Sequence, residues 1–390
     1  MTQGLPDFGG DSGAAEAMLL GAASTATGLH DFGDPAEYMG GLRRLLQAIG
    51  SEVKLTSAGR QFAFGVLLGP LMSRLHAQEG WRRRPDCLAR PVTAPIIIIG
   101  LPRTGTTALH HLLSLDPQFQ GPEMWLIDSP MPRPPRGTWK ANPAHQQCAA
   151  VIQSLLSAAP NFAVAHPRDA DLVDECLDIV KQCYVSNAWA TYFPVPSYDA
   201  WWPTQDHGPQ YRYLRRVLQL IGADDQRRWL LKDPVTIMHL PVLQDVFPDA
   251  SLIVTHRDPA EVIPSVASLI RSFQSLLLGD QLDTHRLAER EVEVWSRGAN
   301  LLARTTTTQR RVDVHMRSFQ DDPLGVVHSI YDGLGLRLPE PAEVAMRTAL
   351  ANAKTTPRVE HRYSLEEFGL RADAIRERFK PYIERFNVLG

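Results

Sequence analysis

The chain has few cysteines, no long apolar run and no excess of positive charge, and each absence excludes a class of protein. Its four cysteines form no C-x-x-C pair in 390 residues, which indicates reduced thiols in a cytoplasmic protein rather than a disulfide framework. No apolar run approaches the ~20 residues of a membrane-spanning helix. The N-terminus, MTQGLPDFGG, lacks the basic and apolar segments of a signal peptide. The formal net charge of −3 argues against nonspecific nucleic-acid binding, which needs a basic surface.

A strand, a glycine-containing loop and a helix follow one another in PIIIIGLPRTGTTALHHLL, residues 95–113. Residues 96–99 form a continuous β-branched run of the kind that is buried on both faces of a sheet. A helical pattern begins at Thr107 and ends before Asp116. In such a unit, loop amides and the positive end of the helix dipole point to one place, where an anion can bind.

This loop lacks the lysine of a nucleotide-triphosphate P-loop. Gly100 and Gly105 have the P-loop spacing, and Thr107 occupies its Ser/Thr position, but Thr106 replaces the lysine and the positive charge lies at Arg103. A guanidinium beside hydroxyl groups suits a terminal group with less charge than a triphosphate and no metal ion. The alternative is an ordinary strand–turn–helix unit with an incidental arginine.

A second stretch that contains candidate site residues begins at the short apolar run 229–231. Lys232-Asp233-Pro234 follows it, and open α/β sheets bind ligands at the C-terminal ends of their strands. A lysine there can stabilise negative charge on a leaving oxygen. The alternative is a salt bridge to Asp233 itself or to another acid.

Another strand and helix follow directly. Residues 251–255 form a buried-strand pattern, and Asp258 and Pro259 are suited to the N-cap and first position of the next helix. Arg257 and Ser265, eight residues apart, can hold one phosphate from two sides. His256 is expected to pack or cap and not to act as a base.

Three further segments have two readings each. Glu123 follows the first strand–loop–helix unit, so it can accept a proton from an acceptor hydroxyl or lie solvated in a loop. The charged segment 166–175 can border an acceptor pocket, although a capped helix start over 172–185 is favoured. The aromatic segment 189–202 either forms its own small core or lines a site for an apolar or ring-bearing substrate.

The arginine loop, the Lys-Asp-Pro triplet and the Arg257/Ser265 pair, in this order, resemble the motifs of the PAPS-dependent sulfotransferases (PAPS is 3′-phosphoadenosine 5′-phosphosulfate). The resemblance is to the branch with arginine in the loop, which includes bacterial and tyrosylprotein sulfotransferases, and it is firm over residues 95–125 and 228–270. It implies that Arg257 and Ser265 bind the 3′-phosphate. It implies a phosphosulfate-binding loop formed by Arg103, Thr104, Gly105, Thr106 and Thr107.

The same resemblance implies the remaining roles. Tyrosylprotein sulfotransferases carry a glutamate base in a Gly-Glu-Glu triplet, and Gly121-Pro122-Glu123 lies at a similar place here. Their Lys-Asp-Pro lysine stabilises the leaving group, as Lys232 would. Family members also close a basic C-terminal loop over the 3′-phosphate, for which Arg358, His361 and Arg362 are the candidates, although the Arg-Lys-Gly string of the human cytosolic type is absent.

We therefore predict one α/β domain over residues 89–390, with a P-loop-like three-layer fold, a mostly parallel sheet and helical insertions, preceded by a helical region at 1–88. The expected strands are 96–99, 229–231, 251–255 and 312–316. The predicted reaction is metal-free transfer of a sulfuryl group from PAPS to a hydroxyl on a small molecule, lipid or glycolipid, leaving 3′-phosphoadenosine 5′-phosphate (PAP). Glu123 would be the base, and Arg103 and Lys232 would stabilise the transferring group and the leaving phosphate. A P-loop kinase or nucleotide triphosphatase and a non-catalytic nucleotide-binding protein are the alternatives, and the oligomeric state is left open.

Overall fold

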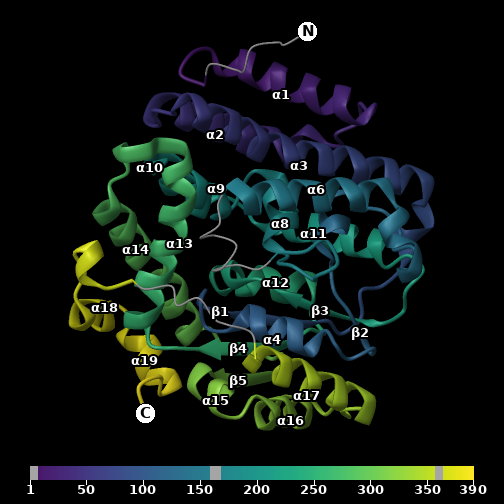
Figure 1. Cartoon of the computed structure of the whole chain (residues 1–390), viewed down its shortest axis with the longest axis vertical. Coiled ribbons are helices and arrows are strands. Elements are labelled where there is room, and N and C mark those ends of the chain that lie inside the picture. Colours follow the sequence, from purple (N-terminus) through teal and green to yellow (C-terminus); the bar gives the residue numbers. More distant parts are fainter. Residues whose placement is uncertain (1–7, 159–167, 356–362) are drawn as a thin grey trace.

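Apolar β-branched runs form the central sheet of the protein, a computed structural model that describes residues 8–158, 168–355 and 363–390 (Figure 1). The strands lie in the order β2-β3-β1-β4-β5, and all neighbours are parallel. They are β1 (Ile96–Gly100), β2 (Phe119–Gln120), β3 (Arg228–Lys232), β4 (Ser251–His256) and β5 (Arg311–His315). Parallel pairing confirms the predicted sheet. It also brings the loops that follow β1, β3 and β4 to one edge.

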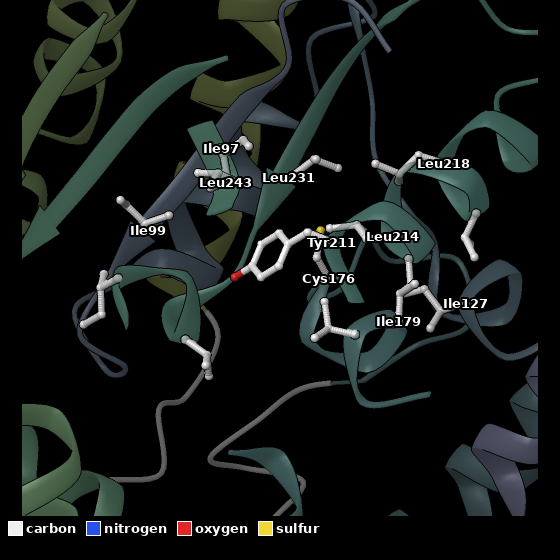
Figure 2. Close-up of a cluster of buried hydrophobic side chains, with 14 of the residues drawn as sticks. Ile97, Ile99, Ile127, Cys176, Ile179, Tyr211, Leu214, Leu218, Leu231 and Leu243 are labelled. Carbon is white, nitrogen blue, oxygen red and sulfur yellow. The ribbon is translucent and has the colours of Figure 1, made fainter. Parts of the chain in front are cut away.

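Helices cover both faces of this sheet, as the period of two along β1 requires. Ile96 and Ile98 pack with residues of α4 (Thr106–Leu113), α16 (Pro323–Leu334) and α17 (Glu340–Thr355). Ile97 and Ile99 face the opposite layer (Figure 2). That layer contains α11 (Gly208–Ile221), α12 (Leu240–Val246), α13 (Pro259–Leu278) and α14 (Thr284–Arg304). The three-layer prediction is confirmed.

The N-terminal helices have a core of their own, which lies away from the sheet (Figure 1). It is formed by α1 (Ser12–Thr27), α2 (Met39–Glu52) and α3 (Ser57–Arg83) together with α9 (Ala188–Tyr192) and α10 (Pro196–Trp201). Trp189, Phe193, Tyr198 and Trp202 are buried there. Most of the aromatic segment therefore belongs to a core, while a domain boundary at residue 88 stays a prediction.

The predicted helix over 172–185 is wrong in its first half. The α-helix α8 spans only Leu177–Val180, followed by a 3-10 turn, Lys181–Cys183. Before it, Val173 forms an antiparallel bridge with Glu123, and the Cys176 amide donates to the Lys232 carbonyl at 2.9 Å. The segment crosses the carboxyl ends of β2 and β3 and satisfies their backbone groups, so tertiary pairing overrides the local helical pattern.

Other local predictions have mixed outcomes. Asp258 caps α13 by accepting a hydrogen bond from the Ala260 amide at 2.9 Å, as expected. β5 and α15 meet at Met316, so the strand ends one residue before the predicted end at 316. Ser364 precedes a 3-10 turn, Glu366–Phe368. The remaining helices are α5 (Met124–Asp128), α6 (Pro143–Ala158), α15 (Met316–Asp321), α18 (Ala372–Arg378) and α19 (Lys380–Phe386).

Within the described ranges, no helix combines the length and apolarity that crossing a membrane requires. All four cysteines are buried and unpaired.

Candidate active site

The loop after β1 is held in a conformation that suits anion binding. Arg103 and Gly105 have φ angles of 63° and 84°, in the left-handed region. Such turns direct successive backbone amides toward one point. A Cβ atom on Gly100 would lie 2.5 Å from the Thr255 carbonyl oxygen, and one on Gly105 would lie 2.4 Å from the Met316 Sδ atom. The backbone thus requires glycine at both positions, and α4 begins directly after the loop.

The threonines of the loop have different tasks. The Thr104 hydroxyl donates to the Leu101 carbonyl at 2.6 Å and lies 2.6 Å from the Thr255 hydroxyl, so this side chain braces the loop from inside. Thr106 and Thr107 line a cavity of about 380 Å³, and Thr107 accepts a hydrogen bond from Lys232. Any contact of Thr104 with a cofactor would be made by its backbone.

Arg103, Arg257 and Ser265 lie together although they are far apart in the sequence. The Arg103 Nε atom donates to the Ser265 hydroxyl at 3.0 Å, and the Arg257 Nη1 atom donates to the Arg103 carbonyl at 3.0 Å. Arg257 also pairs with Glu261 at 2.8 Å. Burial lowers the pKa of Arg103, and the like charge of Arg257 adds to this effect. Two guanidinium groups and a hydroxyl therefore border the same cavity, where an anion would relieve their repulsion.

Lys232 extends from the end of β3 to a carboxylate that the sequence reasoning did not assign to the site. Its Nζ atom donates to Glu175 Oε1 at 2.5 Å and to the Thr107 hydroxyl at 3.1 Å. Asp233 instead caps the next turn through the Val235 amide and the Thr236 hydroxyl, at 2.8 and 3.1 Å. Burial, together with the nearby charge of Glu175, raises the pKa of Asp233 to about 7. The lysine thus pairs with another acid and not with its neighbour.

Glu175 was missed because the sequence reasoning included residue 175 in the favoured helix start. The backbone at 173–176 instead pairs with Glu123, Pro122 and Lys232, and Glu175 bonds to Lys232 beside the loop after β1, residues 101–105, which we call the cradle loop. Arg168, from the same charged segment, also lines the cavity. The one available signal was the density of charge at 166–175, and the pocket interpretation, which was not favoured, holds for Arg168 and Glu175.

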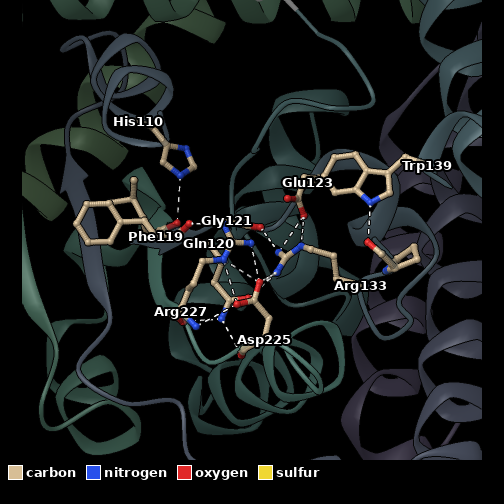
Figure 3. A network of polar contacts seen from close by, with 11 residues as sticks. His110, Phe119, Gln120, Gly121, Glu123, Arg133, Trp139, Asp225 and Arg227 are labelled. Carbon is tan, nitrogen blue, oxygen red and sulfur yellow. Dashed lines mark hydrogen bonds and ion pairs between the residues drawn. The ribbon is translucent and has the colours of Figure 1, made fainter. Parts of the chain in front are cut away.

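Glu123 lies in a buried ionic network (Figure 3). Its Oε2 atom accepts hydrogen bonds from Arg133 Nε and Nη2 at 3.1 and 2.9 Å. Arg133 also donates to Asp225 at 2.9 Å and to the Gln120 side chain at 2.5 Å. The solvated-loop interpretation of Glu123 is therefore wrong. Glu123 lines a larger cavity, of about 1710 Å³, and does not line the cavity that holds Arg103 and Arg257.

The cavity beside the cradle loop is lined by both charged and apolar residues. Its charged lining residues include Arg103, Glu175 and Arg257. Its apolar and aromatic lining residues include Leu177, Tyr192, Val266, Leu269, Ile270, Phe273 and Trp295. The Tyr192 and Phe273 rings meet edge to face, with centroids 5.5 Å apart. The aromatic segment thus contributes Tyr192 to this site while its other rings are in the core.

Some predicted contacts cannot be placed. Arg358, His361 and Arg362, and also His166, lie outside the described residues. His256, in contrast, packs as expected: it is buried, it contacts Tyr382 and Asp313 at 3.0 and 2.9 Å, and burial lowers its pKa.

Known proteins resemble this chain over most of its length. The structure of sulfotransferase STF1 from Mycobacterium tuberculosis H37Rv superposes with a TM-score of 0.84 and 35% sequence identity, over 93% of this chain and 97% of that one. Sulfotransferase STF9 from Mycobacterium avium gives a TM-score of 0.87 and 27% identity, over 95% and 96%. These likenesses confirm the predicted fold class.

Sequence comparison gives the same family. The omega-hydroxy-beta-dihydromenaquinone-9 sulfotransferase Stf3 of Mycobacterium bovis is 26% identical over 263 residues, which are 62% of this chain and 63% of that protein. The model of the sulfotransferase family matches residues 95–340, more than half of the chain, including the cradle loop, Lys232 and Arg257. The chain therefore belongs to the sulfotransferase family.

Proposed function

We propose that this chain transfers a sulfuryl group from PAPS to the hydroxyl of an acceptor with an apolar body, in the cytoplasm. The observation that carries the proposal is the convergence of Arg103, Arg257 and Ser265 on one cavity, with Lys232 bonded to two of its lining residues, Thr107 and Glu175. Family membership favours this reaction over the kinase and non-catalytic alternatives, and nothing in the site favours either of those.

The residues present fit a donor with a 5′-phosphosulfate and a 3′-phosphate. When bound, PAPS supplies the sulfuryl group and a phosphate leaving group. The loop from Arg103 to Thr107 offers a guanidinium, hydroxyls and helix-end amides for the phosphosulfate. Arg257 and Ser265 would hold the 3′-phosphate, and Arg358 and Arg362 would close over it. Lys232 would stabilise the charge that develops on the leaving oxygen.

The walls of the cavity support an acceptor that is apolar beyond its hydroxyl group. Tyr192, Phe273 and Trp295 contribute ring surface to the cavity lining, and such sites select by shape and apolar contact. The relative from Mycobacterium bovis is named for a menaquinone-derived acceptor. We propose a hydroxyl-bearing lipid or a ring compound of similar polarity. The acceptor proton must pass to a base; the family resemblance implies Glu123 for this role, although Glu123 borders the larger cavity and pairs with Arg133.

The test is thermal melting with PAP, and separately with ATP and magnesium. PAP at a hundred times its dissociation constant should stabilise the wild type by about 2.7 kcal/mol without added metal. Arg257→Ala should abolish that shift. Arg271→Ala is the matched control, because Arg271 lies on α13, the helix that follows Arg257, has a similarly exposed side chain (28% against 24%), and pairs with Glu367 outside the cavity. A shift with ATP and magnesium alone would overturn the proposal in favour of the kinase alternative.

A further inference from the structure

Three carboxylates border the cavity beside the cradle loop, counting its described lining residues: Glu175, Asp178 and Glu291. Asp178 is engaged by Lys181 and Arg168. Glu291 is fully buried, with Arg290 donating to one oxygen and the Trp295 indole to the other. Both of these groups are committed to protein partners on the cavity wall. Glu175 differs in its partner, because it pairs with Lys232, the residue proposed to stabilise the leaving group.

The position of Glu175 is set by backbone bonds to the sheet. The Asp174 amide donates to the Pro122 carbonyl, and the Cys176 amide donates to the Lys232 carbonyl, each at 2.9 Å. Glu175 is therefore held from both sides at the carboxyl ends of β2 and β3. Its Oε1 atom accepts the Lys232 bond, whereas Oε2 receives no hydrogen bond from the described part of the chain. A carboxylate with one unused oxygen thus faces the reaction site.

Glu123 offers no comparable geometry. Its Oε2 atom already accepts two hydrogen bonds from Arg133, and it borders the other cavity. Proton transfer to Glu123 would also neutralise one of the two carboxylates that pair with the buried Arg133, which would destabilise this ionic network.

We propose that Glu175 is the general base of the reaction, and that Lys232 keeps it occupied until the donor binds. This inference rests on the proposed function. Lys232 turns from Glu175 to the oxygen that bridges phosphate and sulfate. Glu175 then accepts the proton of the acceptor hydroxyl while the acceptor oxygen bonds to sulfur. The bond from sulfur to the bridging oxygen breaks, and its electron pair stays on that oxygen, beside the Lys232 ammonium group.

The inference predicts that removing the Glu175 charge separates donor binding from turnover. In Glu175→Gln, Lys232 has no competing carboxylate, so PAP should bind about five-fold or more tightly than in wild type. Turnover of PAPS with 2-naphthol as acceptor should fall by about 10²–10⁴-fold. Glu175→Asp, which keeps the carboxylate, should restore part of the turnover. Titration calorimetry with PAP and assay of PAP release measure the two effects.

Asp178→Asn is the matched control, because it removes a carboxylate of the same cavity that does not touch Lys232. Its PAP affinity should stay within about two-fold of wild type, a change well below a typical coupling. If PAP binds to neither wild type nor Glu175→Gln, the proposed function fails. If PAP binds to wild type and Glu175→Gln binds it no more tightly, or turns over at the wild-type rate, only the role of Glu175 is overturned. The PAP affinity of Glu175→Gln relative to wild type tests the proposal even if 2-naphthol is a poor acceptor.

Discussion

Two arginine clusters lie beside the sheet, one after β2 and one after β1, and they differ in the groups that their arginines contact. In the cluster after β2, Arg133 contacts two carboxylates, Glu123 and Asp225, and Arg227 contacts Asp225 as well (Figure 3). In the cluster after β1, Arg257 pairs with Glu261, but Arg103 and Arg257 also donate to neutral oxygens, those of the Ser265 hydroxyl and the Arg103 carbonyl. The first cluster binds its arginines through carboxylates, whereas the second also binds its arginines through neutral oxygens.

This difference distinguishes arginines that stabilise the fold from arginines that can bind a ligand. A buried guanidinium that is fully matched by carboxylates holds chain segments together, and its loss leaves charges without partners. A guanidinium bound to neutral oxygens can exchange them for a phosphate at low cost, because the charge-assisted bond is stronger. Sequence alone did not distinguish these roles, since it placed Glu123 and Arg103 in one catalytic group.

The largest expected effect is on stability, at Arg133. Arg133→Ala should lower the free energy of unfolding by about 3–5 kcal/mol, because Glu123 and Asp225 stay buried without their cation. Urea denaturation measures it. Arg136→Ala is the control on the same loop, since Arg136 is exposed and only stacks over Trp139, so it should change stability by no more than about 1 kcal/mol. Equal losses in both variants would contradict the comparison.

The second effect is on function, at Arg103. Arg103→Met should change stability by less than about 1 kcal/mol, because the apolar stem is kept and repulsion with Arg257 is relieved. Stabilisation by PAP should largely disappear, and PAPS turnover should fall by about 10²–10³-fold. Melting with and without PAP, and PAP release, are the measurements. An Arg103→Met protein that loses several kcal/mol before any ligand is added would show that this arginine too is structural.

The last effect is a pH dependence of opposite sign at two aspartates, Asp233 after β3 and Asp225 in the cluster after β2. Burial raises the pKa of Asp233 to about 7. Burial also acts to raise the pKa of Asp225, but hydrogen bonds from Arg227 outweigh it, so this pKa lies below its ordinary value. A raised folded-state pKa contributes stability that is present below the unfolded value and is lost as pH rises through the folded value. A folded-state pKa that lies below the unfolded value contributes stability that is present above the unfolded value and is lost as the pH falls through the folded value.

The stability of wild type relative to Asp233→Asn should therefore fall as the pH rises from about 4 to about 8, by up to roughly 4 kcal/mol, since each unit of pKa shift corresponds to about 1.4 kcal/mol. Relative to Asp225→Asn, the stability of wild type should fall as the pH drops below about 4, near the ordinary pKa of aspartate. Urea denaturation at several pH values gives both differences. Parallel pH profiles for the two variants would show that the aspartates share one kind of environment.

Local patterns in the sequence were sufficient to predict most of the sheet and the cradle loop. The run 96–99, the glycines at 100 and 105 and the cap formed by Asp258 are all short-range signals, and parallel strands bring their ends together without further information. β2 escaped prediction because Phe119–Gln120 is too short to show a period. The segment before α8 was misjudged because its backbone partners, Pro122 and Lys232, lie far away in the chain.

The sequence by itself thus determined the family, the layered fold and the positions of Arg103, Lys232, Arg257 and Ser265, since each depends on a local motif in a known order. Only the tertiary structure decided which carboxylate pairs with which lysine or arginine. Glu175 reaches Lys232 across 57 residues of sequence, and Arg133 rather than the cradle loop holds Glu123. The physical reason is that ion pairing depends on distance in space, and no local pattern reports which distant charge will come within a few ångströms.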